Sequence, residues 1–488
     1  MSWLRKQWAP GIVVVALLAA SLSATSCSTN PATGKSQIAF IGEEQEVAMG
    51  READQQVVQQ LGLYDDEELQ QYVNRLGQAL ARDSERPNLP WTFRVVDDPV
   101  VNAFAFPGGY IYVTRGLMSH LTTEAELVSV LGHEIGHVTG RHSVEQMSKQ
   151  QLAQIGLIAG MVLRPELANY GDLAQTGLGL MFLKYGRDDE READDLGLRY
   201  MIREGYDPRE MPEVFATLGR VSQQQGAGRI PGWLSTHPVP ENRIKRIEEN
   251  LAKLNQDFSG GKVNREAYLA KIDGIAFGQN PREGYFRGNT FVHPELAFQI
   301  QFPQGWRASN QKQAVGAVSP NEDAVVVLTL AQGRSAEEAA RQFYSQQGIQ
   351  QGPAVRANLG GGAVANVFGV SRGQGGDIQG VAAFVEEGNR VYQILGYTMA
   401  NSFNRYDDVL ASSIGTFGRV TDRRLLNVEP RRVDVVTIPS AMSLDEFNRR
   451  YPSTVDLQTV AIINQANGNT RFPAGAEVKR VVGGEVPS

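Results

Sequence analysis

The sequence has a single cysteine, Cys27, among 488 residues, so no disulfide can form within the chain. It also lacks an excess of positive charge, because 47 Lys and Arg stand against 54 Asp and Glu and the formal net charge is −7. Without a basic block, nucleic acid is not expected as a partner. The apolar run at residues 152–163 is too short to span a bilayer and predicts a buried helix. The balance of 42% hydrophobic and 21% charged residues is ordinary for a globular protein.

The place of that cysteine is informative. A positively charged start and a short apolar stretch at residues 11–20 precede three small residues and Cys27, an order typical of a secretion signal. A cysteine at this point resembles a bacterial lipobox, in which it is lipidated and becomes the mature N-terminus. Ala24 stands where lipoboxes usually have Leu, and a plain secretory signal or an uncleaved anchor is the alternative. Ser28 follows the cysteine in place of Asp, which favours the outer membrane.

Helical periodicity dominates the first half of the chain. Helices are expected over 43–61, 66–81, 123–140 and 173–204, and strands over 92–96 and 103–113. Thr123 followed by Glu126 is a capping-box pattern, which predicts the start of the third helix.

That third helix carries the segment His133-Glu134-Ile135-Gly136-His137. Residues four apart on a helix are about 40° apart around its axis, so His133 and His137 point the same way and can bind one ion. Zinc binds such imidazole nitrogens and, in catalytic sites, leaves one position for water. Glu134 can hydrogen-bond this water, act as general base and pass the proton to a leaving amine. The spacing predicts a zinc metallopeptidase with one Zn²⁺ per chain.

A catalytic zinc needs a third protein ligand. His142 falls about 180° round the helix from the first ligand and is expected to face away, unless Gly140 ends the helix first. Glu190 and Asp194 lie four apart on a later helix, so Glu190 could bind the metal while Asp194 orients a ligating imidazole. Glu192 would lie about 200° from Glu190 and is expected to be solvated. An exposed charged helix face is the alternative interpretation of this acidic group.

These residues together resemble a known family. The His133–His137 segment followed by Glu190-x-x-Ala193-Asp194 resembles the M48 family of zinc peptidases, the Ste24/HtpX-like gluzincins. Residues 102–117 are similar to the strand–turn–strand that precedes the zinc helix in that family, and residues 235–243 are also similar to it. The resemblance covers roughly residues 40–255 and implies a gluzincin fold with Glu190 as the third zinc ligand.

The resemblance also implies roles for three further places. His237 and Arg243 are expected to donate to the developing oxyanion or to hold the substrate backbone, because such donors stabilise the transition state. Alternatively, His237 occupies the open zinc position and holds the enzyme latent, or the two are an ordinary loop histidine and a surface arginine. Asn102, Ala103 and Phe104 are expected on an edge strand along which an extended peptide substrate lies.

The second half of the chain shows no catalytic constellation. Alternating patterns at 298–302, 324–330 and 390–397 predict strands, and Ser335 with Glu338 caps a helix. This module loosely resembles PsbP-like domains.

The last part, residues 430–482, has a strand–helix–helix–strand pattern that resembles a degenerate LysM domain, which would bind peptidoglycan. The usual Gly-Asp is replaced by Ala441-Met442, so a purely structural βααβ cap is the alternative.

The expected fold class is multidomain: a mainly α gluzincin-type peptidase domain with a small β-sheet, then an α+β domain and a LysM-like βααβ unit. The expected organisation is a signal segment with lipobox (1–27), a tether (28–41), an M48-like zinc peptidase domain (42–255), a linker (256–284), a PsbP-like α+β domain (285–420) and the LysM-like unit (425–488).

The expected function is a zinc-dependent endopeptidase that faces the periplasm and hydrolyses misfolded or misassembled cell-envelope proteins. Its expected partners are those protein or peptide substrates, the outer membrane through a lipid anchor and, through the LysM-like unit, peptidoglycan. The substrate class follows from the resemblance and the compartment, and not from the motif. The alternatives are an envelope chaperone in which proteolysis is secondary and a peptidoglycan-associated protein with a vestigial site.

Overall fold

The structure is a computed structural model that describes residues 27–151, 184–225, 232–237, 242–355, 359, 363–371 and 376–485. The expected signal segment and the apolar run at 152–163 lie outside these residues. The chain forms two compact units, Met1–Gly278 with Val433–Val481, and Gln279–Arg432 with Val482–Ser488. Among the described helices, none is both long and apolar enough to cross a membrane.

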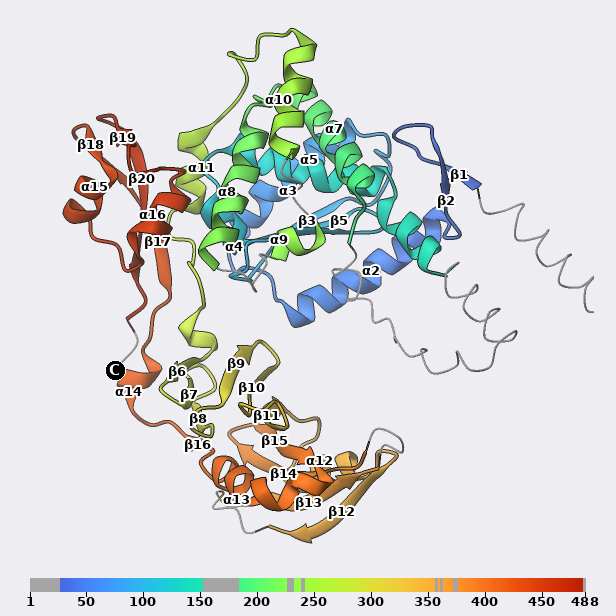
Figure 1. Ribbon diagram of the computed structural model, residues 1–488, viewed down its shortest axis with the longest axis vertical. Coiled ribbons are helices and arrows are strands. Elements are labelled where there is room, and N and C mark those ends of the chain that lie inside the picture. Colours follow the sequence, from blue (N-terminus) through green and yellow to red (C-terminus); the bar gives the residue numbers. More distant parts are fainter. Residues whose placement is uncertain are drawn as a thin grey trace, which may run out of the picture. The chain divides into compact units, whose positions relative to one another are not determined.

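The first unit is mainly helical around a small sheet (Figure 1). Its helices are α2 (Glu43–Gln60), α3 (Glu67–Arg82), α4 (Arg115–His120), α5 (Glu124–Thr139), α7 (Arg187–Arg203), α8 (Glu210–Gln225), α9 (Gly232–Thr236), α10 (Arg243–Leu254) and α11 (Arg265–Ile272). Its first strands are β1 (Cys27–Thr29), β2 (Ser36–Ile38), β3 (Thr92–Val96), β4 (Ala103–Phe106) and β5 (Tyr110–Thr114). The helices and strands expected in the described part of this half are therefore confirmed, except that the helix expected over 173–204 begins only at Arg187, after residues 184–186 that are not helical.

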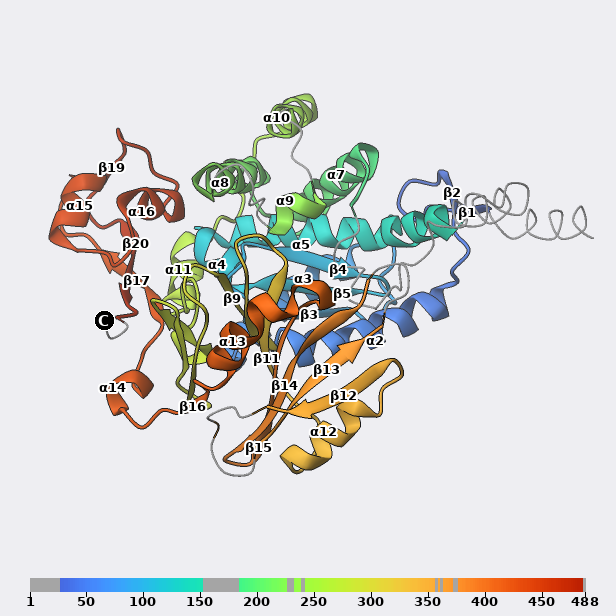
Figure 2. The ribbon, with the colours of Figure 1, turned by 60° about the horizontal axis from the view of Figure 1, so that its bottom comes forward.

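The central sheet has the strand order β3-β5-β4, with β3 parallel and β4 antiparallel to β5. Side chains alternate between two apolar clusters: Ala103 and Ala105 pack with α3 and α5, whereas Phe104 and Phe106 pack with Ala53 of α2. Figure 2 shows α2 on one side of this sheet and α5 on the other. Because both faces are covered, every residue of β4 and β5 is buried.

Helix α5 begins where the capping-box pattern predicts. The Thr123 hydroxyl accepts a hydrogen bond from the Glu126 amide at 3.1 Å, and the Glu126 carboxylate accepts one from the Thr123 amide at 3.3 Å. These bonds satisfy amides that have no partner within the helix. The start of the helix fixes the rotation of the two histidines that follow on it.

The region expected as a linker, 256–284, is in part a packed element of the first unit. Helix α11 lies within it, and Tyr268, Leu269 and Ile272 are fully buried in the main apolar cluster of that unit. The first unit consequently continues to Gly278.

The C-terminal residues form the expected βααβ arrangement, with β17 (Arg431–Thr437), α15 (Leu444–Arg450), α16 (Leu457–Ile463) and β20 (Glu477–Gly483). Two short strands, β18 (Met442–Ser443) and β19 (Arg471–Phe472), pair with each other, as β17 does with β20.

This βααβ arrangement packs on the rest of the first unit. Ile462, Ile463 and Val481 join the main apolar cluster. The buried ammonium of Lys479 donates to the carbonyls of Ser119 and Leu121, at 3.0 and 2.5 Å. The sequence suggested a separate unit; the arrangement has a small core of its own around Phe447, and its other buried apolar residues face the same core as the zinc-motif helix.

The second unit is rich in antiparallel strands. They are β6 (Tyr285–Arg287), β7 (Thr290–His293), β8 (Phe298–Gln301), β9 (Arg307–Gln311), β10 (Ala314–Val318), β11 (Ala324–Leu330), β12 (Ile349–Ala354), β13 (Val364–Val370), β14 (Ile378–Glu387), β15 (Arg390–Met399) and β16 (Gly418–Arg419). They form a seven-stranded sheet of order β12-β13-β14-β15-β11-β10-β9 and a four-stranded sheet of order β16-β8-β7-β6.

The helices of the second unit lie on opposite faces of its larger sheet. On β14, Val381 and Ala383 belong to the cluster of α13 (Phe403–Ile414), whereas Ala382 and Phe384 belong to that of α12 (Ala336–Tyr344). A short α14 (Arg423–Leu426) completes the unit. The three strands and the Ser335-capped helix expected from the sequence are all present.

Candidate metal centre

Two helices, α5 and α7, cross closely because small residues line their contact. A Cβ atom at Gly136 would lie 2.9 Å from Cα of Ala193, and one at Gly197 would lie 3.0 Å from the backbone nitrogen of His133. Larger residues at these positions would push the helices apart. The glycine inside the His133–His137 segment therefore brings the acidic residues of α7 within reach of the histidines.

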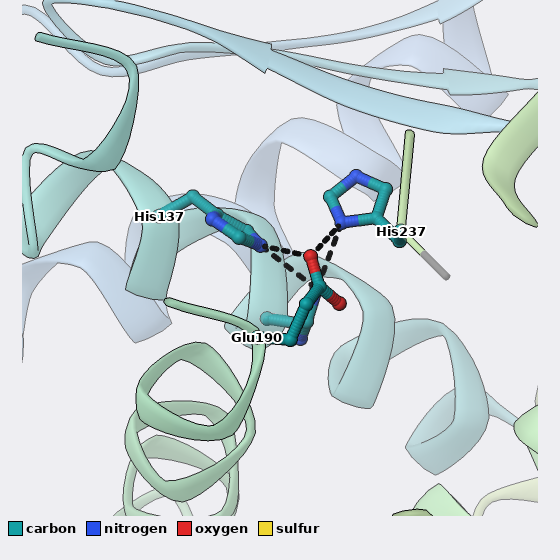
Figure 3. A group of neighbouring side chains, drawn as sticks. His137, Glu190 and His237 are labelled. Atoms are coloured by element: carbon teal, nitrogen blue, oxygen red, sulfur yellow. Dashed lines mark hydrogen bonds and ion pairs between the residues drawn. The ribbon is translucent and has the colours of Figure 1, made fainter. Parts of the chain in front are cut away.

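Four side chains converge where these helices cross, and they are His133, His137, Glu190 and His237. Nε2 of His133 lies 3.0 Å from Nε2 of His137 and 3.3 Å from Nδ1 of His237. Figure 3 shows the carboxylate of Glu190 between the rings of His137 and His237; its Oε1 lies 3.5 Å from Nε2 of His137 and 2.9 Å from Nδ1 of His237. One potential ligand atom from each residue lies within 4.8 Å of the others.

The donor set fits a zinc ion. Two imidazole nitrogens and a carboxylate oxygen are the ligands of a gluzincin-type site, in which zinc is held by protein nitrogen and oxygen atoms at about 2.0–2.2 Å. Burial and the neighbouring histidines lower the pKa of His137 well below its ordinary value, so its ring is in the neutral form that binds a metal. The structure thus brings together the two histidines and the glutamate expected as ligands, and it places His237 beside them.

Asp194 lies behind His133. Its Oδ1 is 3.1 Å from Nδ1 of His133, the ring nitrogen that faces away from the four-residue cluster. Burial alone would raise the pKa of Asp194, but the charge of Arg243 and the contact with His133 hold it below its usual value. A carboxylate in this position fixes the tautomer and orientation of a ligating imidazole.

Arg243 is buried and bridges the two carboxylates of α7. It donates through Nη1 to Glu190 at 2.7 Å, and through Nε and Nη2 to the two oxygens of Asp194 at 3.0 and 2.6 Å. Its guanidinium also lies over the ring of Phe215, 4.2 Å from the centroid. The sequence suggested a surface arginine or a donor to the substrate, and in the structure these donors are directed to Glu190 and Asp194.

Glu134 is fully buried beside the cluster. Its Oε1 accepts a hydrogen bond from Nε1 of Trp233 at 3.1 Å and lies 3.6 Å from Nε2 of His237. Its Oε2 has no hydrogen-bond partner among the described residues. Trp233 also stacks on His237, with ring centroids 4.9 Å apart. Sequence reasoning did not identify Trp233, because a lone aromatic residue in a short helix gives no signal.

His142 and Glu192 are both less exposed than a continuous helix would make them. His142 was expected to face away unless Gly140 ended the helix; the helix does end there, and His142 is buried with its Nδ1 2.9 Å from Nδ1 of His137. Glu192 was expected to be solvated, yet its Oε1 lies 3.3 Å from Nε2 of His142. For His142 the reason is that α5 ends at Gly140 and Arg141 has a φ of 55°, which turns the chain back toward the site. Glu192 is covered because His142 and Asn30 contact it.

The strand expected to bind substrate is at an edge of its sheet. Among the described strands, β4 pairs with β5 alone, and Phe104 lies opposite Tyr112. The ring of Phe104 stacks on Tyr112 in the cluster that faces α2. Ala103 packs with the α5 side, and Asn102, just before the strand, accepts from the Thr114 amide through its carbonyl at 3.0 Å.

Comparison with protein families supports the resemblance seen in the motifs. Residues 67–251 match the model of Peptidase family M48. The matched range contains all the residues of the metal cluster, together with Glu134, Asp194 and Arg243. The family resemblance is confirmed for this part of the chain.

Three curated relatives are similar to between 37% and 51% of the chain. The Beta-barrel assembly-enhancing protease of Escherichia coli K12 is 33% identical over 265 residues, which are 51% of this chain and 52% of the relative. The putative Beta-barrel assembly-enhancing protease of Vibrio cholerae is 35% identical over 37% of this chain and 39% of its own. Mitochondrial metalloendopeptidase OMA1 of Arabidopsis thaliana is 31% identical over 48% and 46%. The chain thus spans about half or less of each relative.

Among solved structures, cyanobacterial PsbP from Synechocystis is a neighbour for part of the chain. It is 12% identical and covers 27% of this chain and 91% of its own, with a TM-score of 0.20. This score carries no argument about the fold.

Proposed function

We propose that this chain, whose residues 67–251 match the M48 peptidase model, is a zinc endopeptidase that cleaves misfolded or misassembled proteins of the bacterial cell envelope. The observation that carries the proposal is the buried convergence of His133, His137 and Glu190 with the carboxylate of Glu134 beside them. The names of the relatives in Escherichia coli and Vibrio cholerae, which refer to β-barrel assembly, support the envelope as the source of substrates.

The roles of the residues follow from their positions. Zinc, when bound, would supply the Lewis acidity that lowers the pKa of a water molecule and polarises the scissile carbonyl. Glu134, with one oxygen held by Trp233 and the other without a described partner, is the general base that takes the proton and returns it to the leaving amine. Asp194 orients His133, and Arg243 keeps the two carboxylates of α7 in place.

The metal is tested directly. We expect purified wild-type chain to hold one zinc per chain and His133→Ala to lose it, since His133 is one of the three protein ligands that a catalytic zinc needs. Metal analysis after dialysis measures the ratio. As a control, His120→Gln changes a histidine whose ring lies against the carbonyl of Gly116, away from the cluster, and should keep the metal. A wild-type chain without zinc, or an unchanged zinc content in His133→Ala, would refute the metal centre.

His237 is proposed to hold the enzyme latent. Its Nδ1 lies 2.9 Å from Glu190 and 3.3 Å from Nε2 of His133, so the ring fills the place where a fourth ligand would bind. Its backbone amide donates to the carbonyl of Trp233 at 2.8 Å, which extends the turn of α9 toward the site. A substrate must displace this ring before the carbonyl can approach the metal.

The latent state predicts a gain of activity. We expect His237→Ala to keep zinc and to cleave a short unstructured peptide about tenfold faster, because the competent state is no longer a minor population. Initial rates with a fluorogenic peptide measure the change. A fall in kcat at unchanged zinc content would instead show that His237 is an oxyanion donor, the alternative role.

Strand β4 is proposed to bind substrate as an added antiparallel strand. Its outer edge, which pairs with no strand in the described part of the chain, and its contact with α5 place main-chain groups beside the helix that carries Glu134. Main-chain pairing gives affinity with weak side-chain preference, which suits a protease for many unfolded segments.

The location at the outer membrane is proposed from the lipobox-like sequence before Cys27 and from the named relatives. If Cys27 carries a lipid, Cys27→Ser should move the protein from the membrane fraction to the soluble periplasmic fraction. A chain that fractionates identically after this change has no lipid anchor at that residue. Peptidoglycan binding by the βααβ unit stays a prediction, tested by sedimentation of the full chain with cell-wall sacculi.

A further inference from the structure

The two histidines of the zinc motif differ in what supports them from behind. Nδ1 of His133 meets a carboxylate directly, that of Asp194 at 3.1 Å. Nδ1 of His137 meets a second imidazole, that of His142 at 2.9 Å, and Nε2 of His142 lies 3.3 Å from Oε1 of Glu192. A carboxylate therefore contacts His133 directly, whereas His142 lies between His137 and its carboxylate.

We propose that His142 and Glu192 form a positioning relay that orients His137 and connects it to the N-terminal hairpin of β1 and β2. The inference rests on the proposed metal centre, because it concerns the orientation of one of its ligands. The tip of the hairpin completes the relay, since Nδ2 of Asn30 donates to Oε1 of Glu192 at 2.5 Å.

Hydrogen-bond polarity fixes the tautomers along the relay. If Nε2 of His137 is to bind a metal, its proton must be on Nδ1, and Nδ1 of His142 must accept it. His142 then carries its own proton on Nε2 and donates it to the carboxylate of Glu192. Each ring therefore has one possible tautomer. The carboxylate of Glu192 at the end of the relay makes His137 a more basic ligand, as carboxylates behind ligating histidines do.

Local backbone geometry shows how the sequence builds the relay. A Cβ atom at Gly140 would lie 2.5 Å from Nε2 of His142, so only glycine leaves room for the ring. Arg141 follows with a φ of 55°, a conformation that costs free energy for a residue other than glycine. Its guanidinium is held by Glu46 at 3.1 Å, Ser28 at 3.2 Å and the carbonyl of Ile41 at 2.7 Å. These bonds compensate for the conformation that turns His142 toward His137.

Hydrogen bonds within the hairpin also fix the orientation of the Asn30 side chain. Oδ1 of Asn30 accepts from the amides of Ala32 and Thr33, at 2.8 and 3.1 Å, which leaves Nδ2 directed at Glu192. Asn30 is buried, whereas the nearby Lys35 is exposed and lies 3.9 Å from the same carboxylate. Asn30 thus supplies the hydrogen bond and Lys35 a longer ion pair, and a hairpin that moves away would remove a donor from the relay.

Zinc affinity of the full-length protein tests the relay, measured by competition with a chromophoric chelator. We expect Glu192→Ala and His142→Gln each to weaken zinc binding about 10-fold to 100-fold, the usual effect of losing such outer partners. The double variant should bind zinc as tightly as the more impaired of the two single variants, because both changes break the same chain of hydrogen bonds. We expect Asn30→Ala to weaken binding by about fivefold, as for one hydrogen bond. Ser36→Ala, at an exposed position of the same hairpin, is the control and should leave zinc affinity unchanged.

A readout independent of affinity comes from cobalt. The visible absorption of Co²⁺ in the site reports ligand geometry, and we expect it to shift in Glu192→Gln, a variant that conserves size and packing. The control on the same helix is Asp195→Asn, whose side chain is more than half exposed. Unchanged zinc affinity and an unchanged cobalt spectrum in Glu192→Gln, or fully additive single effects, would overturn the relay. Failure of the wild-type chain to bind either metal would instead refute the metal centre itself.

Discussion

Replacing Glu134 by Gln is expected to lower the rate of peptide hydrolysis by roughly 10²–10⁴-fold while zinc stays bound, because general base catalysis is lost and the ligands are untouched. The side chain is fully buried, and the glutamine oxygen can still accept from Trp233. The amide cannot take a proton from water. The measurement is the cleavage rate of an unfolded protein substrate, together with zinc content.

Two comparisons make this result interpretable. Trp233→Phe keeps an aromatic ring beside His237 and removes the hydrogen bond to Glu134, so a smaller fall is expected. Asp188→Asn, at a fully solvated position of α7, should have no effect. A Glu134→Gln chain that cleaves at the wild-type rate would exclude the proposed mechanism. If the inactive variant still repairs an envelope defect in cells, the chaperone alternative is the better description of the main function.

Local signals account for the part of the site that could be predicted from the sequence. The capping box at Thr123 fixes where α5 begins, and the four-residue spacing of His133 and His137 then sets their common direction. The same spacing links Glu190 to Asp194 on α7. Each of these expectations depends on residues within one helix, where geometry follows directly from sequence.

The rest of the site depends on breaks in helices and on distant partners. A helical projection of His142 assumes that α5 continues past Gly140, and the positive φ of Arg141 invalidates that assumption. The partners of Arg243 lie 49 and 53 residues earlier in the chain, and no spacing rule connects them. Burial of Glu190 and Asp194 requires a cation nearby, but the sequence does not indicate which arginine supplies it.

The boundaries of the units also depend on contacts between residues that are distant in the sequence. The βααβ pattern of residues 430–482 correctly predicted its elements, but not that Ile462 and Val481 enter the core of the peptidase-like unit. Nothing in a local pattern tells whether an apolar face covers its own module or a neighbouring one. Helix α11 is the second example, since its apolar residues were within a segment of linker-like composition.

Replacing Arg243 by Met is expected to lower the free energy of unfolding by about 3–5 kcal/mol, because two buried carboxylates lose their shared cation. Arg243 is 2% exposed, and Glu190 and Asp194 are 1% and 0% exposed. Asp194 keeps a contact with Arg246 at 3.3 Å, but Glu190 keeps only histidines among the described residues. Urea unfolding followed by circular dichroism measures the loss.

The role of Arg243 is decided by how this loss depends on metal. A bound zinc would neutralise Glu190, so the destabilisation should be larger in chelator-treated protein than in zinc-loaded protein. Arg191→Met is the matched control, because its ion pair with Asp188 lies on the exposed face of α7 and contributes under about 1 kcal/mol. If Arg243→Met unfolds like the wild type and keeps zinc, but has a lower kcat/KM, then Arg243 acts on the substrate, as its place in the motif first suggested. Equal destabilisation with and without zinc would leave Asp194 as the carboxylate that most needs the arginine.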